Sequence, residues 1–148
     1  MKARLATKLD KIAILNLLNE LGKVGNKTSD NAESEKIGEI FNEIISKKNV
    51  FIFVVDENSE ILALATLYLI PYIRHGSYRG HIEDFVVSKE FRNKGIGSFF
   101  IKEIKKYCKT IDISVIKLTS MLDNIIAHDF YEKNGGKHTE KIFRFDIK

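Results

Sequence analysis

Two glycines beside the start of an expected helix are the most informative chemical feature of the sequence. Gly95 and Gly97 follow an apolar segment at 85–87 and a short polar turn, and a helical pattern of apolar residues begins at Gly95. The first N–H groups of a helix have no partner within it, and the helix dipole adds positive potential there. Because glycine has no Cβ, a ligand can approach this backbone closely. The arrangement favours an anion such as a diphosphate, although two glycines alone would equally suit a tight turn and close helix packing.

Ionisable side chains in the strand expected at 81–87 are a second unusual feature. His81, Glu83 and Asp84 occupy its first half, and the remainder is apolar. A central strand covered on both faces is usually apolar throughout, so these residues suggest chemistry. Strand alternation puts His81 and Glu83 on one face and Asp84 on the other, unless a bulge reverses the order. The structural alternatives are a solvated strand end for His81, an ion pair with Arg or Lys for Glu83, and a hydrogen-bond acceptor for Asp84.

Alternating strands and helices must position these residues, and no linker or repeat interrupts residues 1–148, which we expect to form a single domain. Apolar periodicity predicts helices at 8–21, 33–47, 95–109 and 124–133, with a loop between the first two. It predicts strands at 2–7, 50–55, 61–70, 81–87, 114–119 and 141–147, with Pro71 ending an antiparallel hairpin and a polar loop at 72–80. The segment 81–119 is long enough for a right-handed parallel crossover. The expected α/β (α+β) fold is a mixed, mostly antiparallel central sheet of six to seven strands, flanked by about four helices.

Two motifs resemble one known superfamily. The segment Arg92-Asn93-Lys94-Gly95-Ile96-Gly97 is similar, at every defined position, to the pyrophosphate-binding signature Gln/Arg-x-x-Gly-x-Gly/Ala of the GNAT superfamily of acyl-CoA-dependent N-acyltransferases. The segment 124–135 resembles its Asn-x-x-Ala-x-x-Phe/Leu-Tyr-x-x-x-Gly element. Gly135-Gly136 stands where members usually have Gly-Phe, which concerns the packing of the last hairpin and not the cofactor site. The resemblance is firm from residue 81 onward and fits the hairpin, whereas residues 1–49 match only in element order.

The resemblance implies the GNAT fold and acetyl-CoA as co-substrate. The backbone of Phe85, Val86 and Val87 would then pair with the pantetheine arm, and one of their N–H groups would polarise the thioester carbonyl. Asn124 would contact the cofactor or fix the loop after the fifth strand. The turn and first helical residues would hold the diphosphate: Arg92, Asn93, Lys94, Gly95, Ile96, Gly97 and Ser98.

The resemblance also implies roles in acid and base catalysis. An alkyl amine with a pKa near 10 is protonated at neutral pH, so a base or a water chain must take its proton. Glu83 is the first candidate for this base and His81 the second. Tyr131 stands where the family carries its general acid, and its phenol is protonated at pH 7. A tyrosine on an apolar helix face would otherwise be a core residue.

The expected acceptor is the primary amine of a small molecule, attacked directly in a ternary complex. The segment 82–131 looks most like members acting on amino sugar phosphates, aminoalkylphosphonates and similar amines. Arg74 and Arg79 suit a phosphate, phosphonate or carboxylate on that molecule, and Asp84 is a third candidate contact; solvated loop charges are the alternative for the arginines. A protein Nα- or lysine acetyltransferase is the alternative within the family.

Charge and composition narrow the remaining classes. The net charge is +4, but residues 92–109 hold six Lys and Arg against one acid, and the other 130 residues sum to −1. This local surplus suits the phosphates of CoA. A non-catalytic acyl-CoA or nucleic-acid binding module, suggested by the helix lysines, is the competing class, but the sequence has no helix-turn-helix or RNA-binding signature, so we expect no nucleic-acid partner. The lysines are Lys102, Lys105, Lys106 and Lys109.

Several other classes are not expected. With 44% hydrophobic and 30% charged residues the chain is neither disordered nor fibrous. Its lone cysteine, Cys108, forms no internal disulfide, and His128 and His138 lack partners at metal spacing, so no metal is expected. The longest stretch without charge, 61–73, is too short to span a membrane. The sequence predicts a cytoplasmic protein without membrane contact, and leaves a homodimer open.

Overall fold

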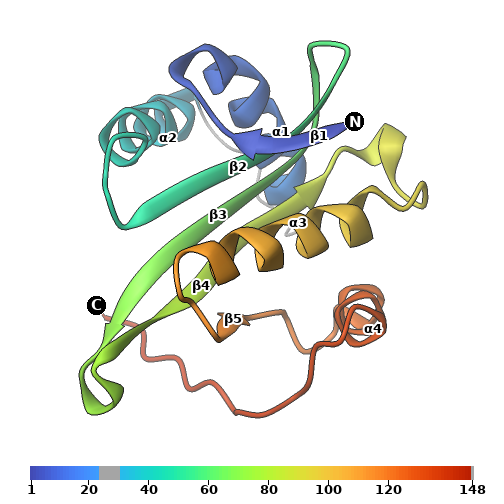
Figure 1. Cartoon of the computed structure of the whole chain (residues 1–148). Coiled ribbons are helices and arrows are strands. Elements are labelled where there is room, and N and C mark those ends of the chain that lie inside the picture. The colour runs from blue at the N-terminus through green and yellow to red at the C-terminus, as the bar shows by residue number, and fades with distance from the viewer. Residues whose placement is uncertain (24–30, 148) are drawn as a thin grey trace. The chain divides into compact units, whose positions relative to one another are not determined.

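The computed structural model describes residues 1–23 and 31–147, and they form two compact units, Met1–Lys117 and Leu118–Lys148. The first unit contains helices α1, α2 and α3 and the longer strands, and the second contains helix α4, Ile125–Lys133 (Figure 1). The loop expected between the first two helices falls largely at 24–30, outside the described residues. No helix among the described residues is long and apolar enough to cross a membrane.

Five strands form one sheet in the order β1-β2-β3-β4-β5. The first four pair antiparallel with their neighbours. The N–H of Gly80 donates to the carbonyl of Val115 at 2.9 Å, so β5 begins beside the first residues of β4. The mixed, mostly antiparallel sheet is confirmed, but six to seven strands is too many, since the described residues form a sheet of five. The strands are Lys2–Leu5, Val50–Glu57, Glu60–Tyr72, Ser77–Val87 and Ile116–Leu118, in chain order.

The strand expected at 141–147 is absent from the second unit. Phe143, Phe145 and Ile147 alternate with polar residues as in a half-buried strand, yet this backbone has no regular secondary structure. All three apolar side chains are at least 80% exposed. Alternation predicts only the capacity to pair, because a strand needs a neighbouring strand for its N–H and C=O groups.

The hairpin of β3 and β4 extends further than the sequence suggests. Pro71 lies within β3 opposite Tyr78, and the residues between the two strands are only 73–76. The N–H of Leu69 points toward the β2 side, to the carbonyl of Asn49, so the nitrogen of Pro71 faces the same side. There β2 has ended, since its first residue, Val50, pairs with Tyr68. Proline is therefore tolerated in β3 because that edge needs no donor. The expectation that Pro71 ends the hairpin strand is wrong, and the loop expected at 72–80 is confined to 73–76.

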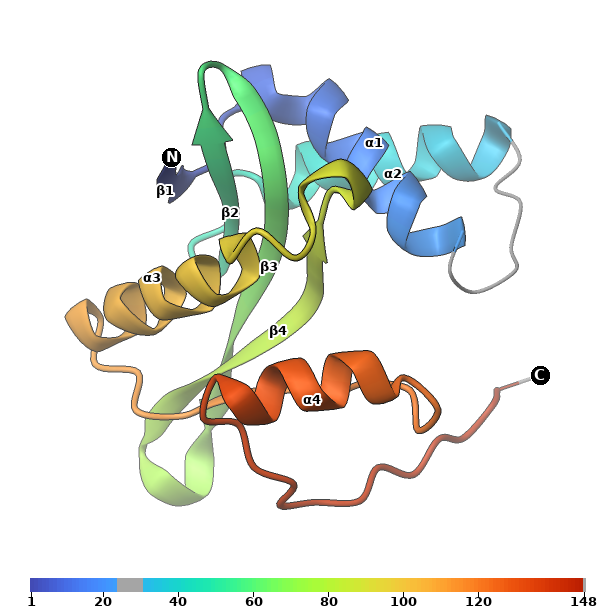
Figure 2. The ribbon, with the colours of Figure 1, turned by 90° about the vertical axis from the view of Figure 1, so that its right-hand side faces the viewer.

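Helices cover both faces of the sheet in the first unit (Figures 1 and 2). On one face, α1 (Lys11–Lys23) and α2 (Asn31–Ile44) pack on strand side chains; we call this the α1/α2 face. On the other face lies α3 (Ile96–Thr110), whose Phe100 ring is 5.4 Å from the ring of Phe85. Cys108 is buried in α3, and burial raises the pKa of its thiol to about 11. The core of the α1/α2 face comprises Ile14, Leu17, Phe41, Ile52, Val54, Leu64 and Val86.

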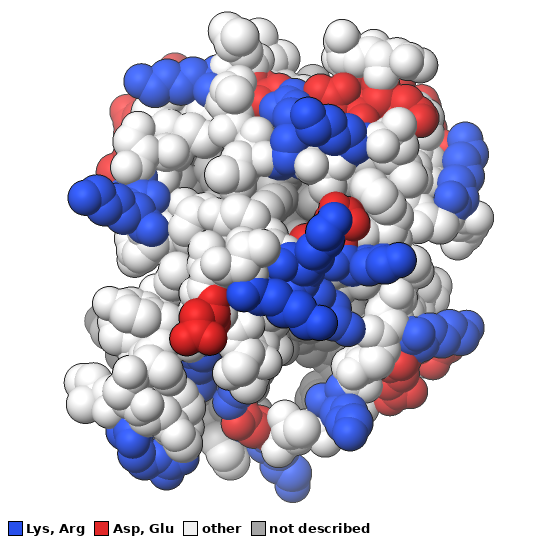
Figure 3. All heavy atoms as spheres, viewed as in Figure 1, with Lys and Arg blue, Asp and Glu red and all other residues white. Residues whose placement is uncertain are grey.

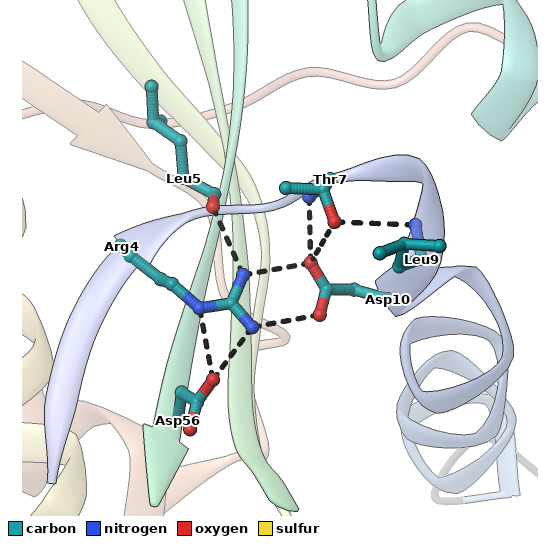
Figure 4. Close-up of polar contacts among 6 residues, drawn as sticks. All are labelled: Arg4, Leu5, Thr7, Leu9, Asp10 and Asp56. Atoms are coloured by element: carbon teal, nitrogen blue, oxygen red, sulfur yellow. Dashed lines mark hydrogen bonds and ion pairs between the residues drawn. The ribbon is translucent and has the colours of Figure 1, made fainter. Parts of the chain in front are cut away.

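A guanidinium bridge ties β1 and β2 to the start of α1 (Figure 4). Arg4 donates two bonds of 2.8 Å to the two carboxylate oxygens of Asp10, and its Nη2 lies 2.7 Å from Asp56 Oδ2. The N–H of Thr7 donates to Asp10 Oδ2 at 2.7 Å. Mainly through the bonds from Arg4, the pKa of Asp10 is lowered to about 2.

We expect Asp10→Asn to lower the free energy of unfolding at pH 7 by about 2 kcal/mol. The folded-state pKa lies below the ordinary value of 3.8, so the contribution of Asp10 is complete above about pH 4 and is lost as pH falls toward 2. Urea unfolding measured between pH 7 and pH 3 checks this, with the exposed Glu35→Gln as control. A constant gap between wild type and Asp10→Asn at all pH values would contradict the assignment.

Candidate active site

The glycine turn opens directly into α3. A short 3-10 helix, Lys89–Phe91, leads to Asn93 at φ 61° and Gly95 at φ 78°, both left-handed. Gly95 precedes the helix, and no side chain caps it. The first helical hydrogen bond runs from the N–H of Phe99 to the carbonyl of Gly95, at 3.0 Å. The N–H groups of residues 96–98 therefore have no partner within the helix. These residues, Ile96, Gly97 and Ser98, fit an anionic group such as a diphosphate.

The charged residues of the turn do more than line it. The Nε of Arg92 donates to the carbonyl of Val87 at 2.9 Å and so joins the turn to the end of β4. The Nζ of Lys94 lies 5.0 Å from the centre of the Phe91 ring. Both side chains are exposed. Arg92 therefore holds the turn's shape, and Lys94 adds positive charge beside the free amides.

The end of β4 carries the residues expected along a pantetheine arm. Phe85, Val86 and Val87 pair on one side with β3. On the other side lies β5, which has three residues against the eleven of β4 and begins near Gly80. β5 therefore pairs with only part of that edge of β4.

A β-bulge in β4 brings both carboxylates to one face. Two steps on β3, from Ala65 to Leu67, correspond to three on β4, so Glu83 and Asp84 both stand opposite Thr66. Simple alternation puts Asp84 on the opposite face from Glu83, and this bulge is the exception that brings the two together. Both carboxylates lie on the α1/α2 face.

Each carboxylate has a different neighbour. The Nε2 of His81 is 3.2 Å from Glu83 Oε2, and the Glu83 side chain is 63% exposed. The Thr66 hydroxyl donates to Asp84 Oδ2 at 2.7 Å and accepts from the Asp84 N–H at 3.0 Å. Burial raises the pKa of Asp84 despite the bond from Thr66. The site thus offers an accessible carboxylate beside an imidazole, and a half-buried carboxylate held by a hydroxyl.

We expect Asp84→Asn to leave the free energy of unfolding at pH 7 unchanged or higher. A carboxyl with a raised folded-state pKa disfavours folding above that pKa, and the penalty is relieved as pH falls through it. Removing the charge removes the penalty, which is the opposite of the effect at Asp10. Urea unfolding of both variants between pH 5 and pH 8 compares them, and a loss as large as that of Asp10→Asn would show that ionised Asp84 stabilises the fold.

The two arginines expected at the acceptor meet on one aromatic ring at the hairpin tip. The guanidinium carbons of Arg74 and Arg79 lie 5.7 Å and 5.4 Å from the centre of the Tyr72 ring. Arg74 Nη2 also donates to the Tyr72 hydroxyl at 2.9 Å. Arg79 is two residues from His81, so alternation puts it on the same face as the carboxylates.

Sequence reasoning missed Tyr68, which pairs with His81 on the α1/α2 face. Thr66 and Tyr68 are two hydroxyl side chains two residues apart in the apolar segment 61–70. That spacing was the available signal, because it places both hydroxyls on one face.

The remaining candidates belong to the second unit. Asn124 caps α4, with its Oδ1 accepting the N–H of Ala127 at 3.2 Å. Tyr131 is in the last turns of the same helix, and burial raises the pKa of its phenol. Gly136 follows closely: its N–H donates to the Tyr131 carbonyl at 2.8 Å, and a Cβ there would stand 2.9 Å from that oxygen. This tight return accounts for glycine at a position where a phenylalanine is usual.

The sequence matches a family model described as the acetyltransferase (GNAT) family over residues 13–136. The chain belongs to this family. The GNAT match crosses the boundary between the two units at Lys117. In residues 1–23 and 31–147, no group of three or more His, Cys, Asp or Glu side chains is arranged to hold a metal ion.

Similar proteins are named mainly as N-acetyltransferases. A glucosamine 6-phosphate N-acetyltransferase of Arabidopsis thaliana is 29% identical over 125 residues, 82% of this GNAT chain and 78% of that protein. An aminoalkylphosphonate N-acetyltransferase of Salmonella typhimurium is 25% identical over 97 residues, 66% of this chain and 62% of that protein. A crystal structure described as a transcriptional regulator from Bacillus halodurans C-125 superimposes with a TM-score of 0.87 at 25% identity, covering 99% of each chain.

Proposed function

We propose that this GNAT chain transfers an acetyl group from acetyl-CoA to the primary amine of a small molecule that carries a phosphate or phosphonate. The observation that carries the proposal is the glycine turn, which opens into an uncapped helix inside the family match. Because this match spans both units, we propose that they act together as one catalytic domain.

Acetyl-CoA would supply the activated acetyl thioester. The free amides of residues 96–98 would bind its diphosphate, and the backbone of 85–87 would align its pantetheine arm. Basic side chains gather on the surface over α3 (Figure 3), where they would attract the cofactor's phosphates. The exposed lysines of α3 are Lys102, Lys105, Lys106 and Lys109.

The bulge in β4 would handle the amine. Asp84 would attract the acceptor's ammonium group, and Glu83, beside His81, would take a proton from it, directly or through water. The neutral nitrogen would then attack the thioester carbon, forming the amide bond as the carbon–sulfur bond breaks. Tyr131 would donate a hydrogen bond to the departing thiolate.

The acceptor class follows from charges at both ends of one sheet face. Carboxylates lie at the bulge, and Arg74 and Arg79 lie at the hairpin tip. Such a surface suits a molecule with an amine at one end and an oxyanion at the other. The two named relatives act on molecules of this kind.

An acceptor panel tests the proposal. Acetyl-CoA would be supplied with glucosamine 6-phosphate, 2-aminoethylphosphonate, glucosamine, ethylamine and a lysine peptide, while thiol release and acetylated product are measured. We expect the phosphorylated or phosphonylated amines to exceed their uncharged counterparts in kcat/KM by at least about tenfold. Acetylation of the peptide alone would favour a protein acetyltransferase, and thiol release at background with every amine would contradict the proposed activity.

A further inference from the structure

Tyr68 stands between the carboxylates and the arginines on the α1/α2 face. It pairs with His81, and the next position of β3 on that face, Thr66, is opposite the bulge. Pairing of β3 with β2 is regular here, from Thr66 opposite Ile52 to Tyr68 opposite Val50, so the two hydroxyl side chains point the same way. Two residues along a strand span about 7 Å, so the phenol can reach the bulge.

Tyr68 marks where the covered part of this face ends. Among the β3 residues on the α1/α2 face, Leu64 is 0% exposed and Thr66 is 4% exposed, whereas Tyr68 is half-buried. Val50, the first residue of β2, lies opposite Tyr68. Tyr68 thus lies at the edge of the core and is partly exposed.

The hydroxyl of Tyr68 is available for a ligand. Within the described ranges 1–23 and 31–147 it makes no hydrogen bond to another residue, although a phenol both donates and accepts. Burial raises the pKa of Tyr68, the charges of Asp84 and Glu83 raise it further, and Lys47 opposes them. The phenol therefore keeps its proton at neutral pH.

We propose that Tyr68 is a further acceptor-binding residue, whose oxygen accepts a hydrogen bond from the substrate's ammonium group and completes, with Asp84 and Glu83, a set of three acceptors. This rests on the proposed function. An ammonium on one carbon has three N–H bonds, one for each acceptor. A protonated secondary amine has only two N–H bonds and leaves one of the three acceptors without a partner. The three acceptors together therefore select primary amines.

Tyr68→Phe tests this, because it removes the hydroxyl and keeps the ring. Tyr78→Phe is the matched control: Tyr78 is 54% exposed, belongs to β4 and alternates to the opposite face from Arg79. Calorimetry in the presence of CoA would measure the Kd of glucosamine 6-phosphate, of 2-aminoethylphosphonate and of their N-methyl derivatives. The affinity for acetyl-CoA and the urea midpoint would be measured on the same proteins.

We expect Tyr68→Phe to weaken binding of the primary amine about tenfold, since the lost bond is to a charged group. The preference for the primary amine over its N-methyl derivative should disappear in Tyr68→Phe and persist in wild type and Tyr78→Phe. Acetyl-CoA affinity and the urea midpoint should stay unchanged.

Three outcomes would overturn the inference. If Tyr68→Phe keeps wild-type amine affinity and preference, the residue is not in the acceptor site, and the proposed function stands. If it lowers the urea midpoint and keeps the preference, its role is structural. If wild type neither binds nor acetylates any amine, the proposed function fails, and the role of Tyr68 fails with it.

Discussion

Glu83→Gln is expected to lower kcat at pH 7 by about 100- to 1000-fold, the usual contribution of a positioned general base. Glutamine keeps the size of the side chain and its place beside His81, but it cannot take a proton from the ammonium group. The acceptor stays protonated, and a protonated amine has no lone pair for attack. Steady-state thiol release at saturating acetyl-CoA measures the effect, and the Kd for acetyl-CoA should not change.

The neighbouring residues supply the controls for this result. Glu90→Gln changes an exposed carboxylate in the turn before α3 and should leave kcat near wild type. His81→Gln removes the imidazole 3.2 Å from Glu83. Full turnover in Glu83→Gln together with a large loss in His81→Gln would transfer the role of base to His81.

Tyr131→Phe is expected to lower kcat by about 100-fold, as when one donor to a developing charge is removed. Burial raises the pKa of this phenol, so it holds its proton at neutral pH and can donate to the leaving thiolate. The ring and its packing remain in the variant. Single-turnover measurements with bound acetyl-CoA would show the loss in the chemical step.

Tyr107→Phe is the matched control for Tyr131→Phe. Burial also raises the pKa of the Tyr107 phenol, but this residue belongs to α3, and its ring centre lies 5.4 Å and 5.0 Å from the ring centres of Phe51 and Phe53 in β2. It should keep wild-type turnover. If Tyr131→Phe also kept wild-type turnover, Tyr131 would not be the acid, and water or another group would protonate the thiolate.

Local features of the site could be predicted from the sequence. The turn at Gly95 depends on residues next to one another: an apolar strand, a polar turn and an amphipathic helix. Glycine at position 95 suits the observed backbone φ of 78°, because residues with a Cβ rarely adopt this left-handed conformation. The order of elements and the mixed sheet follow from the same periodicities.

Features that depend on strand pairing could not be predicted. The bulge that turns Asp84 toward Glu83 exists only relative to β3, through Thr66. Pro71 can belong to β3 because β2 begins only at Val50, opposite Tyr68, and leaves the edge beside Pro71 unpaired by β2; no local sequence pattern contains this. The apolar alternation of 141–147 needs a partner strand that the second unit does not provide among its described residues.

The most direct test of the account is a comparison of acetyl-CoA with S-acetylpantetheine by titration calorimetry on the wild-type protein. S-acetylpantetheine keeps the thioester and the pantetheine arm but lacks the diphosphate and the 3′-phosphate. We expect a Kd of about 1–10 μM for acetyl-CoA and binding at least about 100-fold weaker for S-acetylpantetheine. Equal affinities, or no binding of acetyl-CoA, would contradict the assignment of the glycine turn as the diphosphate site.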